Sequence, residues 1–164
     1  MQLAIRNKWV SFKGSSVVKD MEERDVLKVE GKFWSFTRKK FIKTLDDELK
    51  FMVRNKFWRL FTYRAFIFDP NNKIVATIRR KIFSFHDRYF IKSDYGDFEI
   101  KGNIFQFDYH IFKDGKDIGH VARKFSLRDS FVLDIADGED YYFFVALVIA
   151  IDNITDRRDA DRNS

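Results

Sequence analysis

The sequence contains no cysteine, which excludes disulfide bonds, thiolate catalysis and cysteine ligands for zinc. It has a single proline, Pro70, and only seven glycines in 164 residues. Because apolar residues make up 45% of the chain, this composition predicts a folded domain with a sizeable core, not a disordered chain. No apolar segment follows the charges of the first ten residues, so no signal peptide is expected and the cytoplasm is the predicted location.

Long apolar runs are also scarce, and the longest is the eleven residues 141–151, in a chain that is 34% charged. Asp137 is a suitable N-cap and Asp140 follows at the capping-box position, which predicts a helix over residues 138–155. A helix that is apolar on every side must be enclosed. The run is shorter than the roughly 20 residues of a membrane span, so a core helix is the favoured interpretation. A membrane-associated helix and a buried strand are the alternatives.

The rest of the chain is an internal repeat. Each unit has a basic or small residue, an apolar pair, a polar gap and a second apolar run. The units are residues 7–20, 31–44, 55–69, 80–93, 102–114 and 123–134. Short stretches that alternate apolar and polar residues precede four of them, at 27–30, 49–51, 74–78 and 98–101. Turn signals, among them Asp114-Gly115, separate the halves and indicate successive hairpins.

This pattern predicts an all-β fold, a closed antiparallel barrel of about twelve strands around a central C-terminal hydrophobic α-helix. Closing the sheet removes its exposed edges, and a barrel of this width needs a plug, for which the apolar helix is suited. We expect one domain over residues 1–155 and a disordered polar tail over 156–164. The expected core comprises Trp34, Phe51, Phe66, Ile67, Phe90, Ile91, Phe131, Leu133, Phe144, Leu147, Val148 and Ile151.

The KFxSFxxxxxI repeats, the DIADGED segment at 134–140 and the apolar C-terminal helix resemble the LURP-one-related family, including its small bacterial members. That family belongs to the tubby C-terminal-like group, together with the phospholipid scramblases. The resemblance covers about residues 1–154 and implies a twelve-stranded antiparallel barrel around a C-terminal helix. It implies no established activity for most members. For tubby-type domains it implies binding of phosphoinositide headgroups by Lys and Arg on the barrel surface.

Motifs for catalysis are lacking. His86, His110 and His120 do not have the spacing of a zinc motif, and no nucleophile elbow surrounds Ser126 or Ser130. We therefore predict no enzyme, no catalytic residue, no metal and no cofactor.

The acidic run of Asp134, Asp137, Glu139 and Asp140 leaves two interpretations open, a calcium site or the capped entry to the helix. Its spacing is not that of an EF-hand loop, which favours the cap.

The net charge of +6 permits an anionic partner. Two basic clusters are the candidate site for anionic headgroups: Arg38, Lys39, Lys40 and Lys43, and Arg79, Arg80 and Lys81. Lys side chains that merely keep a strand soluble are the plain alternative. We predict a non-catalytic scaffold or binding domain that associates peripherally with anionic membrane surfaces through these clusters, without a transmembrane segment. An enzyme with a site at the barrel rim and a single-stranded nucleic-acid binder are the alternatives. Nucleic acid is disfavoured because the aromatic residues are expected to be buried. The sequence does not identify a protein partner.

Overall fold

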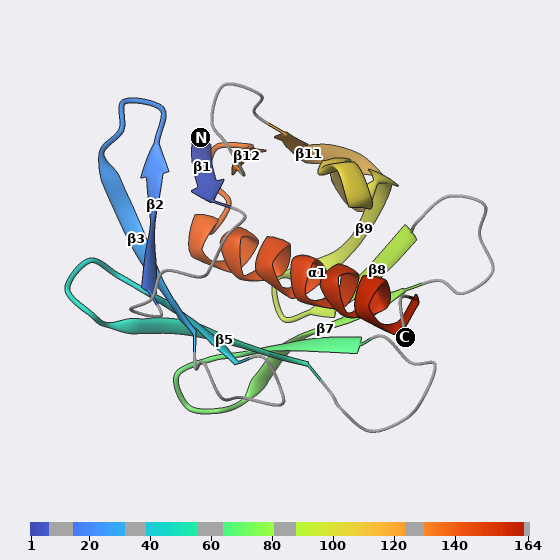
Figure 1. Ribbon diagram of the computed structural model, residues 1–164, viewed down its shortest axis with the longest axis horizontal. Helices are drawn as coiled ribbons and strands as arrows, with labels where there is room; N and C mark the ends of the chain where they lie inside the picture. The colour runs from blue at the N-terminus through green and yellow to red at the C-terminus, as the bar shows by residue number, and fades with distance from the viewer. Residues whose placement is uncertain (7–14, 32–38, 56–63, 81–87, 124–129, 163–164) are drawn as a thin grey trace.

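The computed structural model describes residues 1–6, 15–31, 39–55, 64–80, 88–123 and 130–162. These residues form a closed barrel with one long helix running through it (Figure 1). The strands are β1 (Gln2–Arg6), β2 (Ser15–Asp20), β3 (Asp25–Gly31), β4 (Lys40–Lys43), β5 (Leu49–Asn55), β6 (Arg64–Phe68), β7 (Ile74–Arg80), β8 (Arg88–Ser93), β9 (Gly96–Asn103), β10 (Asp108–Lys113), β11 (Lys116–Arg123) and β12 (Ser130–Ile135). The helices are the 3-10 turn η1 (Ile104–Gln106) and α1 (Tyr141–Arg162).

Every strand pairs antiparallel with its neighbours in sequence, and β1 pairs with β12 to close the barrel. At the closing seam Ile5 lies opposite Phe131, and the amino group of Met1 donates a hydrogen bond to Ile135 O at 2.6 Å. No strand edge is left unpaired among the described strands, which is the physical advantage of closure. The predicted fold class is confirmed.

Tight turns join the strands at one end of the barrel. At the β10–β11 hairpin, Lys113 and Lys116 form the last pair, and the two residues between them have positive φ angles, 49° at Asp114 and 80° at Gly115. Two consecutive positive φ angles match the twist of the flanking strands, which explains why Asp-Gly occupies this turn.

The helix begins later in the chain than the sequence suggested. Gly138 has a φ of 87°, which is not helical, and α1 starts at Tyr141. Its N-cap is Asp140 and not Asp137: Asp140 Oδ1 accepts hydrogen bonds from Tyr142 N at 3.0 Å and from Phe143 N at 3.3 Å. Capping one residue before the apolar run satisfies the first free N–H groups of the helix.

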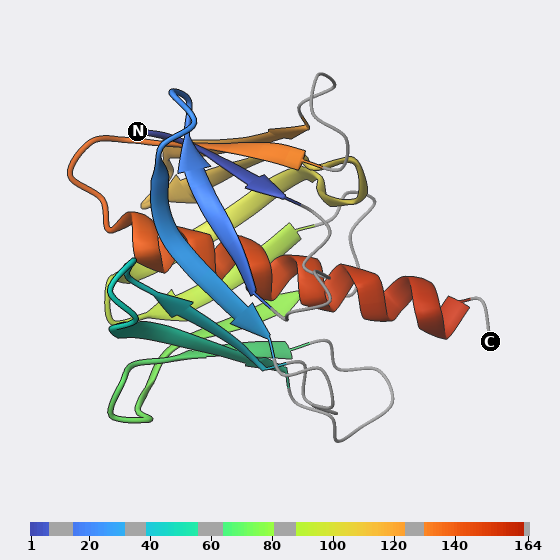
Figure 2. The same ribbon diagram turned by 60° about the vertical axis from the view of Figure 1, so that its left-hand side comes forward.

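The helix also ends later, at Arg162 and not at residue 155. It therefore includes most of the stretch 156–164, for which the sequence predicts a disordered polar tail. Figure 2 shows α1 crossing the barrel from the end where β12 and its connection lie, and extending past the strands on the other side.

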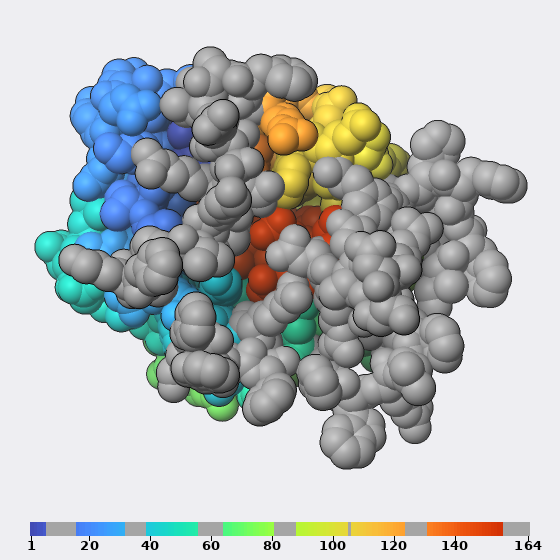
Figure 3. Space-filling model, in the orientation of Figure 1, coloured from blue at the N-terminus to red at the C-terminus, as the bar shows by residue number. Residues whose placement is uncertain are grey.

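The core is the inner face of the barrel wrapped around α1. All residues from Phe143 to Ile151 are at most 1% exposed, so this part of the helix is enclosed on every side. Aromatic rings from the strands pack against the first turn of the helix. The ring centroids of Phe98 and Phe144 are 5.4 Å apart and those of Phe51 and Phe143 are 5.9 Å apart, and both pairs are edge to face. Figure 3 shows atoms of α1, in red, at the centre with strands on both sides.

The predicted core residues are confirmed at nine positions: Phe51, Ile67, Ile91, Phe131, Leu133, Phe144, Leu147, Val148 and Ile151 are buried. The prediction is wrong for Phe90, which is 41% exposed, and for Phe66, which is only half-buried. Both alternate with an inward residue, Ile91 and Ile67, and so face outward. Trp34 lies outside the described residues.

Candidate functional site

The predicted basic residues do not form one cluster. Lys43 is neutralised by Glu30, with Nζ and Oε2 2.7 Å apart, and Lys39, Lys40 and Arg80 each have an interaction partner. Lys40 lies opposite Val53, and Arg80 lies opposite Tyr89. Because Val53 and Tyr89 are buried, this register places Lys40 and Arg80 on the inner face of the barrel. Strands β4 and β7, which carry the two groups, are separated by β5 and β6. Arg38 and Lys81 lie outside the described residues.

Arg79 is the residue of the predicted set that stands exposed on the outer surface, and other cations surround it. Arg54 on β5, Arg64 on β6 and Lys92 on β8 also alternate with buried residues and therefore face outward. Within the described part of the chain, none of these four has a carboxylate at ion-pair distance. We call them the cationic wall.

The centre of the cationic wall is a like-charge pair. Arg64 lies directly opposite Arg79 in the β6–β7 ladder. On the adjoining strand, Phe90 lies opposite Arg79, and on β5 Arg54 lies opposite Phe66. Like charges directly opposite each other in a sheet destabilise it, and paired guanidinium groups are well suited to bind a phosphate. The arrangement therefore favours an anionic ligand that would neutralise both arginines.

Most other basic residues of the described strands are already neutralised. Lys28 pairs with Asp47 at 3.1 Å, Lys50 with Glu48 at 2.8 Å, and Lys73 with Asp94 at 2.7 Å. Exposed pairs of this kind contribute little to stability, but they reduce the local positive potential. Lys116 and Arg123 on β11 also lack such partners among the described residues, so the cationic wall is distinguished by having four such cations on the adjacent strands β5 to β8.

One end of the barrel has the opposite charge. The turns at this end and the link from β12 to α1 lie together at one side of Figure 2. Their residues, 20–25, 44–48, 69–73, 94–97, 114–117 and 136–140, include 15 Asp and Glu against three Lys and Arg. We call this surface the acidic end. It would repel an anionic surface, so such a surface is expected to contact the cationic wall, not this end.

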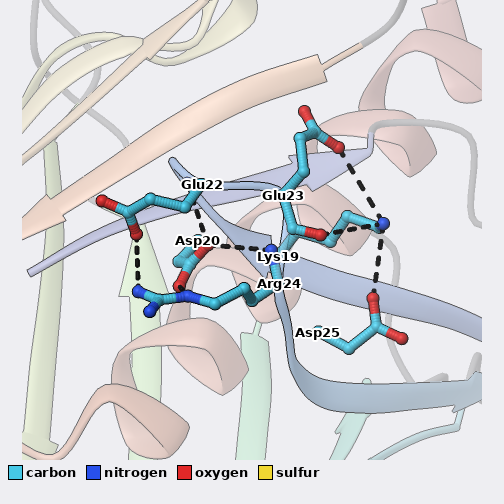
Figure 4. Close-up of polar contacts among 6 residues, drawn as sticks. All are labelled: Lys19, Asp20, Glu22, Glu23, Arg24 and Asp25. Atoms are coloured by element: carbon cyan, nitrogen blue, oxygen red, sulfur yellow. Dashed lines mark hydrogen bonds and ion pairs between the residues drawn. The ribbon is translucent and has the colours of Figure 1, made fainter.

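The β2–β3 turn shows how carboxylates of the acidic end are satisfied (Figure 4). Arg24 Nε donates to Asp20 Oδ2 and Arg24 Nη2 to Glu22 Oε2, both at 2.6 Å, while Lys19 Nζ lies 3.4 Å from Asp25. Desolvation raises the pKa of Asp20, but the hydrogen bonds from the Arg24 backbone and side chain outweigh it, and the net pKa is lowered. The turn is held by its own ion pairs.

The acidic run before α1 is also engaged. Asp140 caps the helix, Glu139 Oε1 lies 3.2 Å from Lys113 Nζ, Asp137 lies 3.4 Å from the Met1 amino group, and Asp134 accepts from Gln2 at 2.8 Å. No group of three or more His, Asp or Glu with the geometry to hold a metal occurs among the described residues. Asp140 is thus the helix cap, and the other three carboxylates bind Lys113, the Met1 amino group and Gln2.

Two histidines are stacked on the outer surface of β10 and β11. His110 lies opposite His120, with ring centroids 4.3 Å apart. His110 Nδ1 is 2.7 Å from Asp117, and His120 Nε2 is 3.0 Å from Asp108. Each imidazole thus already has a carboxylate partner, and the pair is a cross-strand contact with no indicated catalytic role.

The helix turn that follows the apolar run is buried although it is polar, which the sequence gave no reason to expect. Asp152 and Asn153 are at most 4% exposed, and Thr155 donates to Ile151 O at 3.0 Å. Burial, and then the nearby charge of Asp152, raises the pKa of Tyr109 well above its usual value. The Tyr109 hydroxyl and Asn55 Oδ1 are buried and have no hydrogen-bond partner within the described part of the chain. The barrel interior is therefore apolar at one end and polar at the other.

Sequence reasoning missed Arg54, Arg64 and Lys92 because it searched for consecutive basic residues. Cations on neighbouring strands of a sheet are contiguous in space but far apart in sequence. A usable signal was present in the pairs Phe66-Ile67 and Phe90-Ile91, since only one member of each pair can face the core of a strand. Assigning the isoleucines to the core would have placed both phenylalanines outside, beside the cations.

A family model described as LURP-one-related matches residues 1–152. The barrel is similar to that in the X-ray structure of a protein from Arabidopsis thaliana, with a TM-score of 0.69 and 16% sequence identity, over 94% of this chain and 90% of that one. No curated protein matches the chain. Among the described helices none has both the length and the hydropathy needed to cross a membrane.

Proposed function

Since the chain belongs to the LURP-one-related family, we propose that it is a non-enzymatic binding domain whose cationic wall associates peripherally with the anionic headgroups of a membrane. The family and the barrel filled by its own helix favour a binding domain over an enzyme. The observation that carries the ligand proposal is the pair Arg64 and Arg79, which lie directly opposite each other and lack a carboxylate partner among the described residues.

Phosphate groups suit this surface on electrostatic grounds. A basic residue near an anionic bilayer contributes about 1 kcal/mol of attraction, and the screening length is about 8 Å at physiological salt. Arg64 and Arg79 lie on neighbouring strands, which are about 4.8 Å apart, so these two cations act within that range together. Their attraction must therefore decrease as the salt concentration rises.

The test is co-sedimentation with phosphatidylcholine vesicles that contain or lack phosphatidylserine, at low and high salt. The double variant Arg64→Gln/Arg79→Gln is compared with Lys116→Gln/Arg123→Gln, which removes the same charge from two exposed cations away from the wall. We expect the first variant to lose binding by roughly 30-fold and the control by far less. Absence of binding to anionic vesicles at low salt would remove the lipid function, and equal losses would show that only net charge matters.

Single-stranded nucleic acid is a second candidate, because an exposed aromatic residue lies beside a cation. Phe90 is 41% exposed and lies opposite Arg79, and bases stack on such rings while the backbone contacts cations. Fluorescence anisotropy of a labelled oligothymidine at low salt tests this candidate. Binding that is lost in Phe90→Ala but retained in Phe90→Tyr would support stacking, and no change in anisotropy at low salt would eliminate it.

A further inference from the structure

A row of apolar side chains runs across the outside of the barrel beside the cationic wall. Phe41 on β4 lies opposite Met52 on β5, Met52 lies opposite Phe68 on β6, and Phe68 lies opposite Ile74 on β7. Phe41 and Met52 alternate with the buried residues Ile42, Phe51 and Val53, so they face outward. We call these four residues the apolar row.

The apolar row is exposed at its edge and packed at its middle. Ile74 is 47% exposed, the largest value among the large hydrophobic residues of the described chain. Phe68 is only 9% exposed although it lies outside the core cluster, and its ring centroid lies 6.4 Å from that of Phe66. The row crosses the outside of the four adjacent strands β4 to β7, and Phe90 is a separate exposed apolar side chain on the next strand, β8, opposite Arg79. A barrel wall that faces only water does not require such apolar side chains.

Most charges next to the row and Phe90 are cations. The two carboxylates that lie directly opposite these apolar residues are already neutralised: Glu30, opposite Phe41, pairs with Lys43, and Glu99, opposite Phe90, pairs with Lys101. Arg54 lies two residues after Met52 on the outer face of β5, and Arg64 lies two residues before Phe66 on the outer face of β6. Arg79 on β7 lies directly opposite Phe90, and Lys92 lies two residues from Phe90 along β8 on the same face. An apolar strip bordered by cations with long side chains is the surface expected of a protein that lies at a membrane interface, where apolar groups enter and cations reach the headgroups.

We propose that the apolar row and Phe90 enter the boundary between headgroups and acyl chains of an anionic bilayer, so that the barrel lies on the membrane by its β4–β8 wall. This inference rests on the proposed function, because the cationic wall provides the first attraction. It adds a salt-resistant contribution from apolar burial, which does not depend on screening.

A bilayer fits the surface better than a peptide helix or a second copy of the chain. The wall of a closed barrel curves outward, whereas a peptide helix binds in a groove. A second copy would bring another cationic wall against the first if the two walls met face to face, and like charges would oppose this. The bilayer supplies an anionic headgroup layer that the cations can contact and, beneath it, an apolar layer that the apolar row can enter.

The absence of native cysteine allows a direct test. A single cysteine is introduced at Ile74 or Phe90 and labelled with an environment-sensitive fluorophore, and Ala4→Cys on β1, across the barrel, is the control. The labelled proteins are mixed with phosphatidylcholine and phosphatidylserine vesicles, with and without bromine on the acyl chains. We expect a blue shift and bromine quenching at positions 74 and 90 but not at position 4. We also expect Ile74→Ser to weaken vesicle binding about fivefold, since about half of the side chain is available for burial.

Each other result overturns the inference. If the protein binds vesicles while the labels at 74 and 90 remain in water, the headgroup function stands and apolar insertion is wrong. If the label at position 4 is quenched as strongly, the orientation is wrong. If the labels at 74 and 90 shift with protein concentration in the absence of vesicles, a second copy covers the row. If no vesicle binding occurs at all, both the proposed function and this inference fail.

Discussion

Arg64 lies directly opposite Arg79 on the outer surface of the β6–β7 ladder, and neither has a carboxylate partner among the described residues. A fold under selection for stability alone has no reason to keep this pair, because opposing like charges weaken the sheet. A binding surface has a reason, since an anionic ligand would neutralise both. Stability and binding therefore respond in opposite directions to the same substitution.

The variant Arg79→Gln is expected to keep or slightly raise the free energy of unfolding, by up to about 0.5 kcal/mol, because it removes the repulsion. It should weaken binding to anionic vesicles about fivefold. Urea unfolding and co-sedimentation measure the two effects, with Lys116→Gln as the control for net charge. A loss of more than about 1 kcal/mol of stability would show that Arg79 has a structural role instead.

Leu147 tests the central position of the helix, because it is fully buried in α1. Leu147→Ala should lower the free energy of unfolding by about 2–5 kcal/mol through the lost contacts and the cavity. Leu147→Asp should prevent folding, since it places an unpaired charge inside the barrel. Leu45→Ala, at a position that is 41% exposed in a turn, is the control and should change stability by less than about 0.5 kcal/mol. Wild-type melting of Leu147→Asp would contradict burial of the helix.

Gly102 and Gly115 form a matched pair of positive-φ glycines. A Cβ at Gly102, where φ is 140°, would lie 2.5 Å from Asp108 O and 2.6 Å from Tyr109 Cα, both backbone atoms of the paired strand. A Cβ at Gly115, where φ is 80°, would meet nothing within 4 Å. Gly115→Ala should therefore cost only the backbone strain of about 1–2 kcal/mol, and Gly102→Ala at least about 2 kcal/mol more. Denaturant midpoints compare them, and equal costs would mean that β9 and β10 can separate at this point.

Tyr142 gives a prediction at alkaline pH. Partial burial, the hydrogen bond with Tyr141 and the charges of Glu48 and Asp140 raise the pKa of Tyr142 to about 12. Because the folded pKa lies above the unfolded value of about 10, the folded state holds the proton more tightly. Its contribution to stability is complete below about pH 10 and is lost as the pH rises toward 12. The pH titration of tyrosinate absorbance is measured for wild type and for Tyr142→Phe, and the difference between the two curves should have its midpoint near pH 12. A midpoint near pH 10 would contradict the raised pKa of Tyr142.

The barrel could be predicted because its evidence is local. Period-two alternation in segments such as 74–78 and turn residues such as Asp114-Gly115 specify hairpins one at a time, and closure follows from the need to pair the two edges. The start of the helix was misplaced because both Asp137 and Asp140 are good caps. Which of the two aspartates caps the helix depends on the backbone of Gly138. Its positive φ is allowed for a glycine, but the sequence does not require it.

The candidate site was predicted only in part, and Arg79 is the predicted residue that is unpaired in the described chain. The carboxylate partner of a cation on a strand often lies on the neighbouring strand. The ion pair between Lys43 and Glu30 therefore depends on the register of β3 and β4, which cannot be read from the sequence. The exposure of Phe90 was missed because adjacent apolar residues were both assigned to the core, although a strand can bury only one of them.

The seam between β1 and β12 also has a consequence for how the chain folds. All other strand pairs join sequence neighbours and can form early as local hairpins, whereas the contact of Met1 with Ile135 spans 134 residues. Because α1 follows β12 in the chain and ends up inside, the helix must enter before the seam closes. Until that step, an unfinished barrel has two free strand edges and an uncovered apolar lining, both of which favour aggregation. The joining of the first strand to the last is therefore expected to be the slow step, and variants at Ile5 or Phe131 should slow folding more than equally destabilising variants within a single hairpin.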